Sequence, residues 1–183
     1  KLANSLREQG LYTDAISEYA RLAPIVMKSP GSPYKEILRI WPVYCYVKLY
    51  EQYSKAAAKD KRYLEYANKY FNTALQTVKK LDTTPPPRQT GEYSLYKLVR
   101  SLIRVQYARR YEAQGSQIQA AEYYRQSVLE VTEGIISARV GLAWFPESLM
   151  MAGAAYEKLE LFDAARNVYK QVTMFFKSTK WET

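Results

Sequence analysis

The chain has 183 residues, of which 48% are hydrophobic and 25% are charged, a balance that excludes wholesale disorder and is sufficient for a buried core. It has no histidine and one cysteine, Cys45, so it cannot use a histidine general base, close an intramolecular disulfide or build a thiolate metal cluster. The net charge of +9 favours an acidic protein, an anionic lipid surface or nucleic acid as the partner.

Hydrophobic spacing predicts an all-α chain, because no segment alternates with the period of two expected of a strand. Lys1 to Glu8 resembles the middle of a helix rather than a signal peptide, and without an initiating Met the chain is interpreted as an excised or mature fragment. No stretch has the ~20 continuous apolar residues of a membrane span. In chain order the predicted helices span 1–9, 12–28, 34–58, 60–81, 92–114, 116–138, 146–159 and 161–177.

Prolines predict two interruptions of this helical pattern. Pro42 falls inside the third predicted helix and should kink or restart it near Trp41. The segment TTPPPRQTG, from Thr83 to Gly91, cannot be helical across three consecutive prolines. We therefore expect two helical hairpins in residues 1–82, a Pro-rich linker at 83–91 and two further hairpins in 92–183, all within one continuous solenoid.

One spacing of residue types recurs four times, which indicates a structural repeat. A turn position is followed after five residues by Ala, after four more by an aromatic residue and after three more by a small or apolar residue. Gly suits a tight turn, Ala suits the closest approach of two helices, and the aromatic ring fills the groove between hairpins. The copies are Gly10, Ala15, Tyr19 and Leu22; Arg62, Ala67, Phe71 and Ala74; Gly115, Ala120, Tyr124 and Ser127; and Glu160, Ala165, Tyr169 and Val172.

These positions resemble the signature of the tetratricopeptide repeat, in which a Leu-Gly pair and an aromatic residue precede Gly, Ala, aromatic and Ala. The resemblance covers nearly the whole chain and is best over AGAAYEKLELFDAARNVYKQV, Ala152 to Val172. It implies a solenoid of about four helical hairpins and eight helices that serves protein–protein interaction. The closing run FFKSTKW, after FPES, is also similar to repeats of bacterial envelope proteins, including outer-membrane assembly lipoproteins, and favours a periplasmic or envelope-associated location over the cytoplasm.

The repeats are longer than those of the family. Their alanines are separated by 52, 53 and 45 residues, whereas the tetratricopeptide period is about 34 residues. Longer helices or inserted linkers, and an irregular superhelix, are therefore expected.

The helix predicted after the linker is the candidate partner-binding element. From Tyr93 to Tyr111 it carries five cations and no acidic residue, a local charge of +5. Arg and Tyr together suit recognition of carboxylates, phosphates or aromatic groups. A structural role is the alternative, because Tyr107 and Tyr111 occupy repeat positions that normally pack in a core. The candidate partner-binding residues are Tyr93, Lys97, Arg100, Arg104 and Arg109.

A second group of aromatic residues lies on the helix that contains Pro42. Its members fall on more than one helical face, so some should be exposed or buried against an additional partner, while Trp41 and Tyr50 suit a core. Cys45 beside them is interpreted as a small buried apolar residue. The group comprises Trp41, Tyr44, Tyr46, Tyr50 and Tyr53.

Catalytic motifs are missing from the sequence, and we expect no enzyme activity, no metal and no cofactor. Glu130 and Glu133, one helical turn apart, are interpreted as a solvated face rather than an acid–base pair. The tetratricopeptide clamp that holds acidic chaperone tails is rejected, because Asn4 fits its pattern but Leu102 and Gln106 stand where Lys or Arg is required.

The leading hypothesis is therefore a scaffold that binds an acidic peptide or a partner subunit on its helical face. Nucleic-acid binding, or binding to another anionic surface, is the alternative, argued from the net charge and the Tyr/Arg strip. Oligomerisation stays open, since surface tyrosines suit dimer contacts as well.

Overall fold

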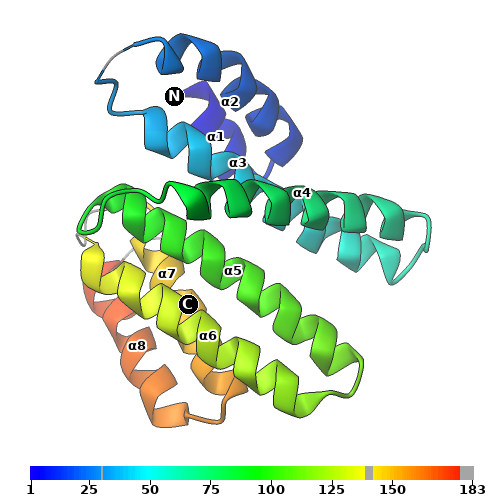
Figure 1. Ribbon diagram of the computed structural model, residues 1–183. Coiled ribbons are helices and arrows are strands. Elements are labelled where there is room, and N and C mark those ends of the chain that lie inside the picture. The colour runs from blue at the N-terminus through cyan, green and yellow to red at the C-terminus, as the bar shows by residue number, and fades with distance from the viewer. Residues whose placement is uncertain (30, 139–141, 178–183) are drawn as a thin grey trace. The chain divides into compact units, whose positions relative to one another are not determined.

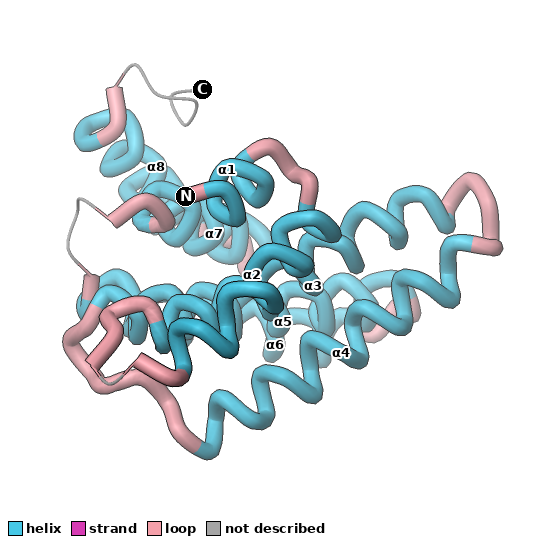
Figure 2. Tube along the Cα trace, turned by 90° about the horizontal axis from the view of Figure 1, so that it is seen from above, coloured by secondary structure: helices cyan, strands magenta, loops and turns pink. Residues whose placement is uncertain are grey.

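The computed structural model describes residues 1–29, 31–138 and 142–177. Over these residues the chain is helical with no strand, which confirms the prediction of an all-α fold of helical hairpins (Figures 1 and 2). The helices match the predicted ranges to within three residues. They are α1 (Leu2–Glu8), α2 (Tyr12–Met27), α3 (Lys35–Ala57), α4 (Tyr63–Thr83), α5 (Gly91–Ala113), α6 (Gln117–Ser137), α7 (Phe145–Lys158) and α8 (Phe162–Phe175).

The chain forms two compact units, Lys1–Pro85 and Pro86–Thr183, and the division falls between the first two prolines of the predicted linker. The non-helical stretch covers residues 84–90, because Thr83 ends α4 and Gly91 begins α5. Proline explains this interruption, since it lacks the N–H that a helix requires and disfavours helical geometry in the residue before it.

Within the first unit, α2 packs against both α1 and α3, and α3 packs against α4. The α3 helix is continuous through Pro42, so the restart predicted near Trp41 does not occur. Proline removes one backbone hydrogen bond from a helix interior, and the burial of α3 on both sides of Pro42 outweighs that loss.

Within the second unit, α5 and α6 form a long antiparallel hairpin, α6 also packs on α7, and α7 packs on α8 (Figure 1). The α5–α6 hairpin has helices of 23 and 21 residues, whereas α7 and α8 have 14 each. The greater length of α5 than of α7 accounts for the longer spacing from Ala67 to Ala120 than from Ala120 to Ala165. Longer helices, rather than longer turns, therefore lengthen the third repeat.

Three of the four hairpin turns have the same backbone geometry. The turn residues Gly10, Gly115 and Glu160 have φ of 79°, 75° and 60°. In each turn the following N–H donates to the carbonyl five residues earlier, at 2.9–3.0 Å: Leu11 to Leu6, Ser116 to Tyr111, and Leu161 to Tyr156. These bonds are those of a Schellman-type helix end.

The second hairpin turns differently. Arg62 has φ of −58°, and the Asp60 carboxylate accepts a hydrogen bond from the Arg62 backbone N–H at 3.0 Å. The turn position of this repeat therefore needs no glycine, which explains how Arg is accommodated there.

Among the three left-handed turn residues, Glu160 is the one that is not glycine. Because glycine adopts positive φ without the strain that a Cβ causes, we expect Glu160→Gly to raise the free energy of unfolding by about 0.5–1 kcal/mol. The reciprocal change, Gly115→Ala, should lower it by about 1 kcal/mol. Urea denaturation followed by circular dichroism measures both. A Glu160→Gly protein less stable than the wild type would contradict the strain argument.

The alanines of the repeat lie at helix contacts, as their spacing predicts. Ala15, Ala67, Ala120 and Ala165 are all at most 2% exposed. In the last hairpin the two helices lie closer still, because a Cβ added to Gly153 of α7 would overlap Cε1 of the Tyr169 ring on α8. Small residues at these positions let the helices of each hairpin approach closely.

Packing inside the first unit accounts for the aromatic residues of α3. Trp41, Tyr44 and Tyr50 are buried, and the Arg7 guanidinium of α1 lies 3.6 Å from the centre of the Trp41 ring. Tyr46 and Tyr53 are half-buried and stack with tyrosines of α4; the ring centroids of Tyr53 and Tyr70 are 5.4 Å apart. Tyr46 and Tyr53 therefore remain partly exposed to solvent, as expected of a group whose members fall on more than one helical face.

Cys45 is fully buried in the same helix, as its interpretation as a small apolar residue predicts. Burial raises the pKa of its thiol to about 12. The thiol is therefore protonated at neutral pH and shielded from solvent.

Candidate functional site

The α5 helix, which carries the candidate partner-binding residues, is anchored at its start and buried along much of its length. The Thr90 hydroxyl accepts a hydrogen bond from the Tyr93 N–H at 3.1 Å and caps the helix. The apolar residues of its other face are buried: Leu95, Leu98, Val99, Leu102, Ile103 and Val105.

The five candidate residues lie in three different environments. Tyr93 is buried, with 5% of its surface exposed, and its hydroxyl donates a hydrogen bond to Glu133 of α6. Lys97, Arg100 and Arg104 are half-buried, and Arg109 is exposed. The structure therefore does not gather these five side chains into one open surface.

Lys97 and Arg100 form a charge cluster with two glutamates of α6. The Lys97 ammonium lies 2.7 Å from a carboxylate oxygen of Glu130 and 2.7 Å from one of Glu133. Arg100 Nε lies 2.8 Å from the other oxygen of Glu130, and its Nη1 donates to the Tyr96 hydroxyl at 3.1 Å. Two cations and two anions thus neutralise each other between the helices.

The helices meet closely at this cluster. A Cβ added to Gly134 of α6 would lie 2.9 Å from the Cβ of Lys97 and 3.2 Å from the Ser94 carbonyl oxygen. Deeper in the same interface the hydroxyls of Ser101 and Ser127 are 2.7 Å apart. Glycine at position 134 therefore lets α6 present its glutamates to α5.

Pairing shifts the pKa values of the cluster. Burial by itself would lower the pKa of Lys97, but its hydrogen bonds to Glu130 and Glu133 outweigh burial and raise it. The hydrogen bonds from Lys97 and Tyr93 lower the pKa of Glu133, whereas burial and the bond to Glu133 raise that of Tyr93. Each shift favours the protonation state present at neutral pH.

These contacts correct the interpretation of Glu130 as part of a solvated face. Its side chain is only 13% exposed, and it bridges both cations; Glu133, at 43%, remains partly open. The charge of +5 was summed over Tyr93–Tyr111 alone, a stretch without an acidic residue, whereas the compensating acids Glu130 and Glu133 lie on α6, 30 or more residues later in the chain. The spacing of Glu130 and Glu133, one turn apart on a helix that faces α5, is the signal that could have predicted this pairing.

Acid should weaken the cluster, and Glu133 makes this testable. Because the folded-state pKa of Glu133 is lowered, its contribution to stability is present above its ordinary pKa of 4.5 and is lost as the pH falls through the folded value. We therefore expect the melting temperature of Glu133→Gln to fall less between pH 6 and about pH 3 than that of the wild type, measured by circular dichroism. Glu122→Gln, an exposed control on the same helix, should follow the wild-type curve.

Arg104 lies apart from the charge cluster, beside a tyrosine stack. The stack consists of Tyr123 of α6 between Tyr107 and Tyr111 of α5, with ring centroids 5.1 Å and 5.4 Å apart and interplanar angles of 21° and 15°. The Arg104 guanidinium lies 6.0 Å from the centre of the Tyr123 ring. All four side chains are half-buried, so each also presents surface to solvent.

The residues considered for a chaperone-tail clamp have other roles in the structure. Asn4 accepts a hydrogen bond from the Tyr19 hydroxyl at 2.8 Å, between α1 and α2. Leu102 and Gln106 are buried, with 1% and 2% of their surfaces exposed. This arrangement gives no support to a clamp.

Across the part of the chain that the structure describes, no cluster of three or more acidic or thiol side chains could hold a metal ion. No helix in the same ranges is long and apolar enough to cross a bilayer. A scan of protein-family models found none that matches the chain, and a search of curated proteins found no significant match.

Proposed function

We propose that the chain is a protein-interaction scaffold of the tetratricopeptide type, and that its second unit binds an acidic segment of another protein through Arg104 and the tyrosine stack beside it. The observation that carries this proposal is the combination of a partly exposed guanidinium with three partly exposed tyrosine rings on one hairpin. Interfaces are enriched in tyrosine and arginine: a tyrosine ring buries a large area at low entropic cost, and a guanidinium can bind a carboxylate through two hydrogen bonds.

The charge cluster limits the proposed binding surface to fewer residues than the five candidates, because two of their cations are already paired. Lys97 and Arg100 lie within 2.7–2.8 Å of Glu130, so a partner's carboxylate would have to displace an existing ion pair to reach them. The Arg104 guanidinium lies beside the Tyr123 ring, and Arg109 adds positive charge further along α5. An acidic peptide is the complementary partner.

The repeat architecture supports the same class of function. Helical hairpins that pack on their sequence neighbours present extended surfaces built from many helices, which suit protein recognition. The similarity of the closing run to repeats of envelope proteins supports a place in a bacterial envelope assembly.

Arg104→Glu tests the proposal. We expect it to reduce retention of the bound partner about ten-fold, which corresponds to about 1.4 kcal/mol of binding free energy, because it replaces the central cation of the surface with a like charge. The measurement is affinity purification with quantitative mass spectrometry. Arg100→Glu is a poor choice for this purpose, since it would also break the contact with Glu130.

Lys79→Glu is the matched control, because it makes the same change of charge at an exposed position of α4. It should retain the partner as the wild type does. If Arg104→Glu retained the partner as well as the wild type does, the proposed binding surface would be refuted. Loss of all captured protein on nuclease treatment would instead favour the nucleic-acid alternative, with binding that falls steeply as salt increases.

A further inference from the structure

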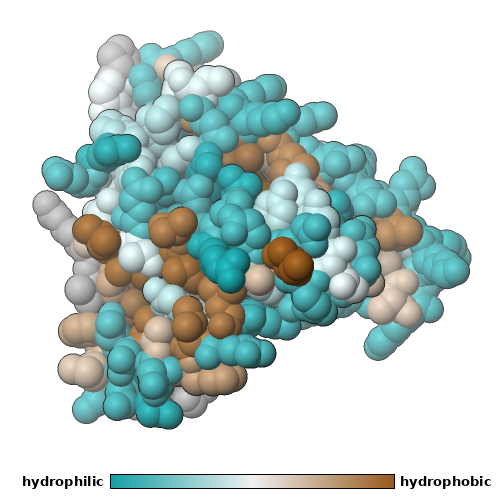
Figure 3. Space-filling model, turned by 60° about the horizontal axis from the view of Figure 1, so that its bottom comes forward, coloured by the Kyte–Doolittle hydropathy of each residue, from teal (hydrophilic) through white to brown (hydrophobic). Residues whose placement is uncertain are grey.

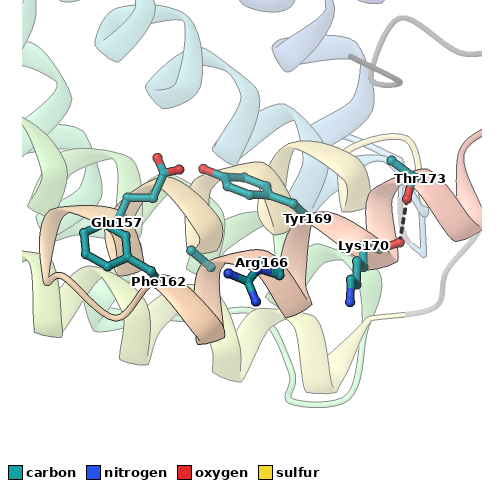
Figure 4. Close-up of a pocket in the computed structure, with 7 residues that line it drawn as sticks. Glu157, Phe162, Arg166, Tyr169, Lys170 and Thr173 are labelled. Carbon is teal, nitrogen blue, oxygen red and sulfur yellow. Dashed lines mark hydrogen bonds between the residues drawn. The ribbon is translucent and has the colours of Figure 1, made fainter.

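A groove runs along α8 on a different part of the second unit. It has a volume of about 390 Å³ and is lined by Glu157 of α7 and by residues of α8 (Figure 4). The Glu157 carboxylate and the Tyr169 hydroxyl point toward each other at one side of the groove. Burial, the Glu157 charge and a hydrogen bond to Glu157 raise the pKa of Tyr169 to about 12. The α8 residues of the lining are Phe162, Ala165, Arg166, Tyr169, Lys170 and Thr173.

The preceding hairpin has the same groove. A cavity of about 240 Å³ on α6 is lined by residues that correspond to those of α8 at a constant offset of 45 residues, the separation of Ala120 and Ala165. Glu112 corresponds to Glu157 and Tyr124 to Tyr169. The remaining pairs are Gln117 with Phe162, Ala120 with Ala165, Ala121 with Arg166, and Arg125 with Lys170.

In that preceding hairpin, the end of α7 covers the groove. Lys158 Nζ lies 2.9 Å from one carboxylate oxygen of Glu112, and the Tyr124 hydroxyl donates to the other at 2.9 Å. Leu159 packs against the cluster that contains Ala120 and Tyr124. The groove of α6 is therefore a helix-binding groove, in which a lysine meets the glutamate and an apolar residue meets the alanine and the tyrosine.

The groove of α8 keeps the features that bind a helix, but within the described ranges no helix follows α8 to cover it. Tyr124 is only 3% exposed whereas Tyr169 is half-buried, and Glu157 is exposed. Phe162, in place of Gln117, is 62% exposed and adds apolar surface at the groove. Figure 3 shows apolar residues at the surface in brown; those of α8 and the turn before it include Leu161, Phe162, Met174 and Phe175.

We propose that the α8 groove binds an amphipathic helix of a partner protein, in the way that α7 covers the groove of α6. The partner helix places a lysine or arginine on Glu157 and an apolar side chain on Ala165 and Tyr169. The competing occupant is α1 of a second copy of the chain. In α1 the residue two positions before the turn is Glu8, whereas in α7 it is Lys158, which pairs with Glu112. Glu8 would therefore meet Glu157 with like charge, which favours a partner helix that carries a cation there. The site is on α7 and α8 and does not depend on the Arg104 surface.

The probe for this site is a fluorescent peptide with the sequence of residues 145–161, FPESLMMAGAAYEKLEL. An isolated helix of this length is marginal in water. A hydrocarbon staple between positions 147 and 154, two helical turns apart and neither buried in α7, would hold it helical. Fluorescence anisotropy should show saturable binding to the 183-residue protein, and no saturation up to about 1 mM would overturn the proposal.

Matched substitutions identify the groove that is occupied. Glu157→Gln should weaken peptide binding about ten-fold, and Glu112→Gln should leave it unchanged, because Glu112 is already held by Lys158. A Lys158→Glu peptide should bind the wild type poorly and bind Glu157→Lys protein better. Sensitivity to Glu112→Gln alone would mean that the peptide displaces α7, and would refute the assignment.

Sedimentation of the protein without peptide tests the competing occupant. A monomer at concentrations where the peptide binds is the expected result. A dimer that the peptide dissociates would show that a second copy fills the groove, and would overturn the proposal of a separate partner protein.

Discussion

Phe71→Ala is expected to lower the free energy of unfolding of the first unit by about 3–5 kcal/mol, the usual cost of truncating a fully buried phenylalanine. Phe71 is the aromatic residue of the second repeat and is 0% exposed, with its ring centroid 4.8 Å from that of Tyr50. Its neighbours Ala67 and Ala74 are too small to fill the space left behind. The cavity therefore adds to the lost hydrophobic transfer energy.

Hydrogen exchange with mass spectrometry on the full chain would measure this effect and locate it. The amides of α3 and α4 should lose protection by several orders of magnitude, while those of α5–α8, in the other compact unit, change less. Leu64→Ala, a truncation at a residue of α4 that is 53% exposed, should cost about 0.5 kcal/mol or less. Similar losses for the two variants would refute the central place of Phe71 in this core.

Glu130→Ala is expected to cost about 2–3 kcal/mol in the second unit, because it leaves the Lys97 ammonium and the Arg100 guanidinium without their shared carboxylate in a half-buried interface. Because Glu133 can still pair with Lys97, the loss of unfolding free energy should be smaller than for a buried charge left without any partner. Urea denaturation followed by circular dichroism provides the measurement.

Glu122→Ala is the control on the same helix. Glu122 lies 3.7 Å from Arg125, and both side chains are more than half exposed, so the loss should be about 0.5 kcal/mol or less. A double-mutant cycle of Glu130→Ala with Arg100→Met would then isolate the coupling between the two side chains. A coupling near zero would contradict the role assigned to the cluster.

The hairpin turns and the helix contacts could be predicted from sequence because they depend on local rules. A left-handed turn favours glycine, and Gly10 and Gly115 stand at such turns. The buried alanines follow from spacing, since Ala15, Ala67 and Ala120 recur at the same distance from their turns. Glu160 could be assigned to a turn only by alignment with the other copies, because its own side chain does not favour positive φ.

The candidate site could be predicted only in part, because its contacts join different helices. The basic composition of α5 was visible, but the neutralisation of Lys97 and Arg100 depends on which face α6 turns toward α5. Gly134 sets that approach, and a single glycine in a helical pattern does not indicate which neighbour it admits. The stack of Tyr123 on Tyr107 likewise depends on the register of the two helices.

Burial of the only cysteine makes Cys45 a natural reporter of the opening of the first unit. A thiol reagent attacks the thiolate, and Cys45 combines complete burial with a raised pKa, so its labelling in the native protein requires the unit to open first. The rate of alkylation, followed by the mass of the intact chain, would therefore time that opening without an engineered probe. Partners or solution conditions that stabilise the first unit would slow the reaction, and those that act elsewhere would leave it unchanged.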